Sequence, residues 1–195
     1  RAAVNDGRAD FTPCFLSEIP GLFKTGRITL NTALIQVSPP DEHGFCSFGV
    51  EVGVTKTAAG AATRVIAEIN PRMPRTLGDS FIHISKLHTI VPADYPLPEV
   101  HMASADGVTE RIADHVASLI PDGATLQTGI GAVPDAVLRR LKDRKDLGVH
   151  TELFSDGVID LVAMGVINGE RKTLHPGKIV AGQVRRLLEA ETAFT

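Results

Sequence analysis

The segment from 122 to 157 constrains the fold of this chain more than any other stretch. It reads DGATLQTGIGAVPDAVLRRLKDRKDLGVHTELFSDG, in the order strand, glycine turn, helix, strand and helix start. Residues 124–128 favour a short strand, and residues 129–131 (Gly-Ile-Gly) form a turn without large side chains. Pro134 suits a first helical position, where its missing N–H costs nothing. A strand–helix–strand unit of this length makes the two strands parallel, with a right-handed crossover.

The helix and the second strand complete this unit. Residues 149–153 favour a strand, and Ser155 and Asp156 are expected to cap a helix that begins near Val158. Three apolar side chains of the first helix recur at helical spacing and are expected to be buried: Val137, Leu138 and Leu141.

The geometry of the unit predicts a site at one edge of the sheet. Neighbouring parallel strands end at the same edge, so the turn at 129–131 and Glu152 should face one crevice, where open α/β sheets bind ligands. Backbone N–H groups at a helix start can hold an anion or a developing oxyanion. A carboxylate beside such donors suggests acyl chemistry.

Composition limits the class of protein. The chain has 195 residues, 43% of them hydrophobic, which suffices for one good core or two modest ones. A net charge of -3 and a pI near 6.2 give no reason to expect a nucleic acid or a membrane surface as partner. Cys14 and Cys46 are too few for a disulfide framework, so we expect a reducing cytoplasm. No apolar run approaches the ~18 residues of a membrane-spanning helix.

The first part of the chain, residues 1–95, reads as strands that alternate with short helices. The predicted strands are 11–16, 29–37, 64–69 and one or two within 81–91, and the predicted helices are 17–24 and 55–62. Pro92, Pro96 and Pro98 then indicate a stiff connector, which sets a domain boundary between about 92 and 106.

The second part, residues 106–195, begins with a helix capped by Asp106. Five apolar residues are predicted to share its buried face: Val108, Ile112, Val116, Leu119 and Ile120. The chain opens on Arg1 rather than Met and ends in a pattern that predicts a helix (Val184, Leu187, Leu188). We therefore expect an internal piece of a longer protein, with two α/β domains that are both incomplete.

Several motifs have a simpler structural interpretation. The glycine pair alone is weak evidence, and an NAD fingerprint needs a third glycine where this chain has Pro134. Glu152 taken alone would more often be a solvated carboxylate. Cys46 is predicted to be a buried small hydrophobe, and the basic run 139–145 a solvated helix end, with a nucleotide phosphate contact as the alternative. No metal-ligand spacing links His43, His150 and His175, so we expect no metal.

The motifs together resemble one family. GIGAVPDAV, HTELFSDGV and LHPGKIV are similar to motifs of the acetyl-CoA hydrolase/transferase family, and most of all to those of the 4-hydroxybutyrate (butyrate-type) CoA-transferases. The resemblance extends upstream through VNDGRADFTPCFLSEIP, ALIQVSPPDEHGFCSFGV and NPRMPRTLGDSFIHISK. It covers the chain to about Ala181.

The resemblance implies open, mostly parallel α/β sheets of CoA-transferase type, in the C-terminal part of a first domain (1–95) and the N-terminal part of a second (106–195). It implies that Glu152 is the catalytic nucleophile, which carries CoA as a glutamyl thioester between a short-chain acyl-CoA and a carboxylic acid. The residues that match the CoA-contacting loop are Gly129, Ile130, Gly131, Ala132 and Val133. Members of the family are cytoplasmic homo-oligomers, and coenzyme A enters as the acyl-CoA substrate.

Three alternatives stay open. Water in place of the acceptor acid would make the same site an acetyl-CoA hydrolase. A sugar-phosphate isomerase-like domain would use Glu152 as a general base, but it would leave the first half of the chain unexplained. A truncated, non-catalytic homologue would serve as a binding or assembly module.

Residues 1–195 alone are expected not to catalyse CoA transfer and to self-associate, although Glu152 and the glycine turn are both present.

Overall fold

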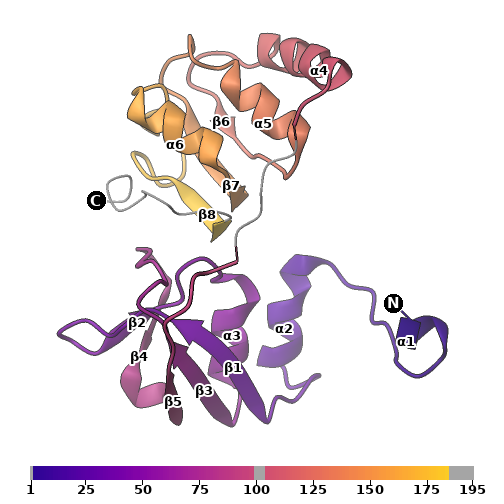
Figure 1. Ribbon diagram of the computed structural model, residues 1–195, viewed down its shortest axis with the longest axis vertical. Helices are drawn as coiled ribbons and strands as arrows, with labels where there is room; N and C mark the ends of the chain where they lie inside the picture. Colours follow the sequence, from indigo (N-terminus) through magenta and orange to yellow (C-terminus); the bar gives the residue numbers. More distant parts are fainter. Residues whose placement is uncertain (1, 99–103, 185–195) are drawn as a thin grey trace.

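The computed structural model describes residues 2–98 and 104–184, which form two lobes, each with its own parallel sheet (Figure 1). Each lobe also has its own cluster of buried apolar side chains. The α/β class with mostly parallel sheets is therefore confirmed.

The first lobe contains a parallel sheet in the order β1-β3-β5 and a small antiparallel pair, β2 with β4. Its strands are β1 (Thr32–Val37), β2 (Phe45–Ser47), β3 (Arg64–Ile69), β4 (Phe81–His83) and β5 (Thr89–Pro92). Its helices are α1 (Ala2–Asn5), η1 (Leu16–Glu18), α2 (Ile19–Lys24), α3 (Gly53–Ala61) and η2 (Ile84–Lys86). β3 has the predicted bounds, and Pro92 belongs to β5 rather than to the connector.

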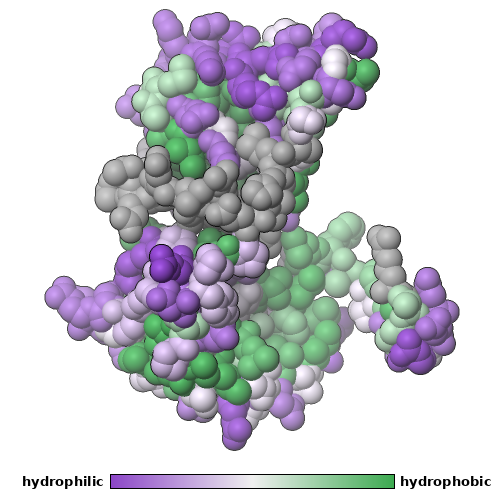
Figure 2. Space-filling model, in the orientation of Figure 1, coloured by the Kyte–Doolittle hydropathy of each residue, from purple (hydrophilic) through white to green (hydrophobic). Residues whose placement is uncertain are grey.

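One face of the β1-β3-β5 sheet carries the core of the first lobe. Ala33, Ile35 and Val37 alternate along β1 and are buried, as a half-covered strand requires. The other face is open, since the Leu34 side chain is 78% exposed. Figure 2 shows apolar surface gathered over this lobe, whereas the second lobe is mostly hydrophilic on the same view.

The second lobe contains three parallel strands in the order β6-β7-β8, with helices beside them (Figure 1). The strands are β6 (Thr125–Leu126), β7 (Gly148–Phe154) and β8 (Val180–Val184), and the helices are α4 (Gly107–Ser118), α5 (Ala132–Arg139) and α6 (Asp156–Ala163). Among the described residues, no helix is long and apolar enough to cross a membrane.

The strand–helix–strand unit at 122–157 forms as predicted. β6 and β7 are parallel neighbours, and Val137, Leu138 and Leu141 are all buried. α5 begins at Ala132, so Pro134 is its third residue rather than its first. A proline is tolerated there because the first-turn N–H groups have no partner within the helix.

The apolar face predicted for the helix after Asp106 is wrong. Asp106 does cap α4, accepting a hydrogen bond of 2.8 Å from the Thr109 N–H, but the buried residues are Ala113 and Ala117. Their small side chains let α4 pack closely on α5. Ile120 is partly buried and packs against the core. The other four of the five larger side chains are exposed: Val108, Ile112, Val116 and Leu119.

Three other predictions are corrected. Residues 11–16 form no strand, because no described sheet edge pairs with them, and Phe11 and Phe15 are both more than 70% exposed. Val184 belongs to β8 rather than to a helix, and the rest of that predicted helix (185–195) lies outside the described residues. The predicted Ser155 cap occupies the N-cap position of α6, but its side chain makes no capping hydrogen bond.

Candidate active site

Glu152 lies near the carboxyl end of β7, the central strand of the second sheet. Its side chain is exposed, whereas Thr151 and Phe154 of the same strand are buried. Within the described residues, the Glu152 carboxylate has no hydrogen-bond or ion-pair partner. The strand therefore presents an uncommitted carboxylate at the edge where ligands bind in open α/β sheets.

The glycine turn (129–131) leads from β6 into α5. Gly131 has φ +123°, a conformation that only glycine adopts without strain. The first hydrogen bond into the helix is Asp135 N–H to Gly131 O, at 3.3 Å, so the N–H groups of Ala132 and Val133 precede it. Donors of this kind, at a positive helix end, suit an anion or an oxyanion.

Thr128 and Thr151, the threonine pair, bring the turn and the carboxylate together. The Thr128 N–H donates to Thr151 Oγ1 at 3.0 Å, and Thr151 Oγ1 donates to Thr128 O at 2.9 Å. Thr128 immediately precedes the glycine turn, and Thr151 immediately precedes Glu152. The backbone segments that lead into the glycine turn and into Glu152 therefore lie side by side. Sequence reasoning missed the pair, although a threonine stands directly before each of the two motifs.

The neighbouring position on β8 is a glycine. The register of β7 on β8 pairs Thr151 with Ala181 and Leu153 with Gln183, so Gly182 lies opposite Glu152. Gly182 has no side chain to cover the carboxylate. Its carbonyl accepts a 3.4 Å hydrogen bond from the Val52 N–H, so the first lobe reaches this edge of the second sheet.

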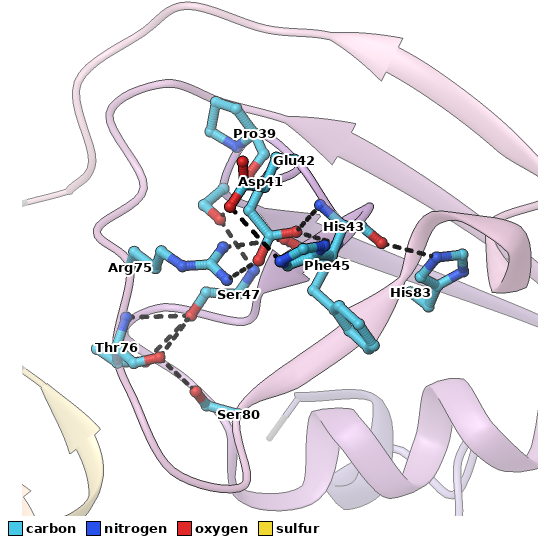
Figure 3. A network of polar contacts seen from close by, with 11 residues as sticks. Pro39, Asp41, Glu42, His43, Phe45, Ser47, Arg75, Thr76, Ser80 and His83 are labelled. Carbon is cyan, nitrogen blue, oxygen red and sulfur yellow. Dashed lines mark hydrogen bonds and ion pairs between the residues drawn. The ribbon is translucent and has the colours of Figure 1, made fainter.

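A second polar network, shown in Figure 3, organises a loop of the first lobe. Asp41 Oδ1 accepts hydrogen bonds from the N–H groups of His43 (3.0 Å) and Phe45 (2.8 Å). Its other oxygen pairs with Arg75 Nη2 at 2.5 Å. The hydrogen bond from the Phe45 N–H, helped by that from His43 and by the Arg75 charge, lowers the pKa of Asp41. These bonds join the loop at 41–45 to itself and to the segment that carries Arg75, which indicates a structural role.

Polar side chains also meet at the carboxyl edge of the first sheet. Gln36 Nε2 donates to Glu68 Oε2 at 2.9 Å and lies 2.7 Å from the Tyr95 hydroxyl, which is itself hydrogen-bonded to Glu68. The bond from Tyr95, followed by that from Gln36, lowers the pKa of Glu68. The carboxylate at this edge is therefore committed to partners within the lobe, unlike that of Glu152.

The basic run 139–145 holds α4 against α5. Arg140 forms ion pairs with Glu110 and Asp114, and Arg139 pairs with Glu110 at 3.4 Å. Arg144 donates to the carbonyl oxygens of Ile120 (2.8 Å) and Ala117 (3.1 Å), at the end of α4. These contacts use the charges internally, which disfavours the alternative of a nucleotide phosphate contact.

Cys46 is fully buried, as predicted, and burial raises the pKa of its thiol. Among the residues that the structure describes, no group of three or more His, Cys, Asp or Glu side chains could hold a metal ion. His150 and His175 have ring centroids 6.5 Å apart.

Lys172 is a buried cation outside the predicted site. It is 4% exposed, and its Nζ donates to Val149 O at 2.9 Å and to Lys178 O at 2.5 Å. Burial lowers the pKa of this ammonium group. Its stem fills the space that a side chain at Gly148 would need, since a Cβ there would lie 2.4 Å from Lys172 Cγ.

Comparison with known proteins identifies the family. Residues 1–101, just over half of the chain, match the model of the acetyl-CoA hydrolase/transferase N-terminal domain. The chain belongs to the acetyl-CoA hydrolase/transferase family. The family resemblance predicted from the sequence motifs is therefore confirmed.

Relatives within the family are longer than this chain. The chain is 59% identical over 180 residues to a 4-hydroxybutyrate coenzyme A transferase from Clostridium kluyveri, covering 92% of this chain and 42% of that protein. It is 50% identical to a succinyl-CoA:acetate/propanoyl-CoA:succinate CoA transferase from Fasciola hepatica, and the match covers 94% of this chain and 39% of that protein. The crystal structure of a 4-hydroxybutyrate CoA-transferase from Porphyromonas gingivalis matches with a TM-score of 0.85 and 48% identity. The match covers 94% of this chain and 47% of that chain.

Proposed function

We propose that the protein of which this chain is part is a CoA-transferase that moves CoA from a short-chain acyl-CoA to a carboxylic acid. The observation that carries this proposal is the exposed Glu152 carboxylate, which has no partner among the described residues and follows a threonine bonded to the residue before the glycine turn. The relatives are named as CoA transferases, and the chain spans about two fifths of their length. In this proposal the two lobes are the C-terminal part of a first domain (1–95) and the N-terminal part of a second (106–195).

The chemistry requires a carboxylate nucleophile. A Glu152 oxygen attacks the thioester carbonyl carbon, the C–S bond breaks, and an acyl-glutamyl anhydride and CoA thiolate form. The thiolate then attacks the glutamyl carbonyl, which releases the acid and leaves CoA on Glu152. An acceptor carboxylate attacks this thioester, and the returning thiolate takes the new acyl group and regenerates Glu152. Covalent catalysis thus divides one difficult exchange into easier steps.

The glycine turn stabilises the charge that develops in these steps. Each tetrahedral intermediate carries an oxyanion, and loss of one well-placed donor typically costs ~3–4 kcal/mol of barrier. The N–H groups of Ala132 and Val133 precede the first hydrogen bond of α5 and suit this role. We assign CoA contacts to the loop residues Gly129, Ile130, Gly131, Ala132 and Val133.

Hydrolysis is the second candidate, because the family includes acetyl-CoA hydrolases by name. Water in place of the acceptor acid would cleave the same glutamyl thioester. We place the enzyme in the cytoplasm as a homo-oligomer that acts on acyl-CoA and small carboxylic acids without a metal.

Intact-mass analysis of the full-length protein tests the mechanism. After incubation with acetyl-CoA and no acceptor acid, the transferase should gain the mass of CoA less water, located on the peptide that contains Glu152. An isomerase-like or non-catalytic protein would show no adduct. Comparing product formation with and without added carboxylic acids then separates the transferase from the hydrolase.

A further inference from the structure

The threonine pair joins the residue before the glycine turn to the residue before Glu152. We propose that Thr151 is a positioning residue, whose hydroxyl sets the place of the Glu152 nucleophile relative to the glycine turn. This inference rests on the proposed function, because it assigns Thr151 a role in the reaction of Glu152.

The backbone pairing between β6 and β7 ends before the site. Only two residues of β6 pair, Thr125 with Gly148 and Leu126 with Val149. Beyond them, Thr151 Oγ1 accepts from the Thr128 N–H at 3.0 Å and donates to Thr128 O at 2.9 Å. A hydroxyl has one donor and two acceptor sites, so one side chain satisfies both backbone groups of Thr128. It continues the connection between the two segments where the strand ladder stops.

The partner hydroxyl contacts β7 on both sides of Glu152. Thr128 Oγ1 lies 3.5 Å from Thr151 Oγ1 and donates to Leu153 O at 3.4 Å. Thr128 therefore holds the residues immediately before and after Glu152. Movement of the glycine turn along β7 would have to break these bonds together.

Burial keeps the pair intact. Thr151 is only 6% exposed, so water does not readily replace the bonds that its hydroxyl makes. Hydrogen bonds are stronger in such surroundings, and buried groups that lose a partner are costly. By contrast, Glu152 has no partner among the described residues. The fixed threonine next to it limits how far the nucleophile can move.

The rate should respond to this restraint. A misplacement of 1 Å can cost about 10²-fold in rate, since reacting atoms need close alignment. Valine has the shape of threonine without the hydroxyl, and serine keeps the hydroxyl. Thr151→Val in the full-length enzyme should therefore lower kcat by roughly 10- to 100-fold, with a smaller change in KM for the acyl-CoA. Thr151→Ser should retain most of the rate.

Ile167→Val is the matched control. Ile167 is buried in the same lobe, and its bridge to Leu147 lies at the amino end of β7, away from Glu152. This variant should lower the melting temperature without changing kcat. Hydrogen exchange of the peptide that covers 127–133 adds a structural readout, and it should speed up in Thr151→Val but not in the control. If Thr151→Val does not fold, Thr128→Val, which keeps the two backbone bonds, should show a smaller loss of kcat.

The outcomes separate the two proposals. If Thr151→Val has the same kcat and the same hydrogen-exchange rate as the Ile167→Val control, the proposed role of Thr151 is overturned. In that case, an inactive Glu152→Gln variant in the same assay would still support the proposed function. An active Glu152→Gln would overturn the proposed function, and the role of Thr151 with it. Loss of kcat in Thr151→Val, recovery in Thr151→Ser and faster exchange in the turn would support the inference.

Discussion

The two lobes each present a carboxylate at the carboxyl edge of a three-stranded parallel sheet, yet only one edge has the features of a site. In the first lobe, Glu68 is hydrogen-bonded to Tyr95 and Gln36. In the second lobe, Glu152 has no described partner, and the residue before it is bonded to the residue before the glycine turn. Parallel topology brings groups to one edge, but the local chain decides whether they stay available to a substrate.

The largest difference should come from removing the two carboxylates in turn. In the full-length enzyme, Glu152→Gln should abolish CoA exchange between acids, because an amide cannot form the anhydride. Glu68→Gln, the matched change in the first lobe, should leave kcat unchanged. Exchange near the wild-type rate in Glu152→Gln would remove the functional distinction between the two edges.

The glycine turn gives the next largest expected effect. Gly131→Ala places a side chain at φ +123°, and such strain typically costs ~1–3 kcal/mol. We expect turnover to fall by about 10²-fold, as for loss of an oxyanion donor. Gly165→Ala is the control, since Gly165 also has positive φ (+73°) and open space around it but lies outside the site. Equal losses of activity in both variants would mean that strain alone, and not the turn, matters.

A smaller effect is expected at Gly182, the residue of β8 opposite Glu152. A Cβ at Gly182 would come no closer than 3.5 Å to Glu152 O, so Gly182→Val should fold normally. The added side chain should obstruct the acyl group and lower kcat/KM by ~10-fold, with a greater loss for longer acyl chains. Steady-state kinetics with acetyl-CoA and butyryl-CoA measure this. Unchanged values for both substrates would show that the acyl group lies elsewhere.

The smallest effect on activity should come from the Asp41 network. Because the folded state lowers the pKa of Asp41, its ionised form contributes stability above the unfolded pKa of ~3.9, and this is lost as pH falls through the lower folded value. Asp41→Asn should be less stable than wild type at pH 7, and the difference should shrink in acid. Urea unfolding at both pH values tests this, with kcat unchanged at pH 7. A difference in stability that is independent of pH would contradict the assignment.

The sequence predicted those helices and strands that are marked by residues within the element or directly beside it. Glycine and proline punctuation located β6, α5 and β7, and apolar runs located β3 within its true bounds. The strand expected at 11–16 failed because apolar composition cannot say whether a sheet edge is available. The buried face of α4 was misassigned because close packing on α5 favoured Ala113 and Ala117 over larger side chains.

The sequence predicted part of the candidate site but not the contacts that hold it together. Glu152 and the glycine turn stood out because each has a local signature, and the strand order brought them together. The bonds between Thr128 and Thr151 join residues 23 positions apart, from side chain to backbone. No local pattern marks such contacts, so only the folded structure reveals them.

The contact between Gly148 and Lys172 restricts which substitutions these two positions can accept. Any side chain at position 148 would collide with the lysine stem, and shortening the lysine would leave the carbonyls of Val149 and Lys178 without their donor. Neither position can change alone without loss. In a library randomised at both positions, surviving variants should therefore be paired, with a larger residue at 148 found only beside a shorter one at 172.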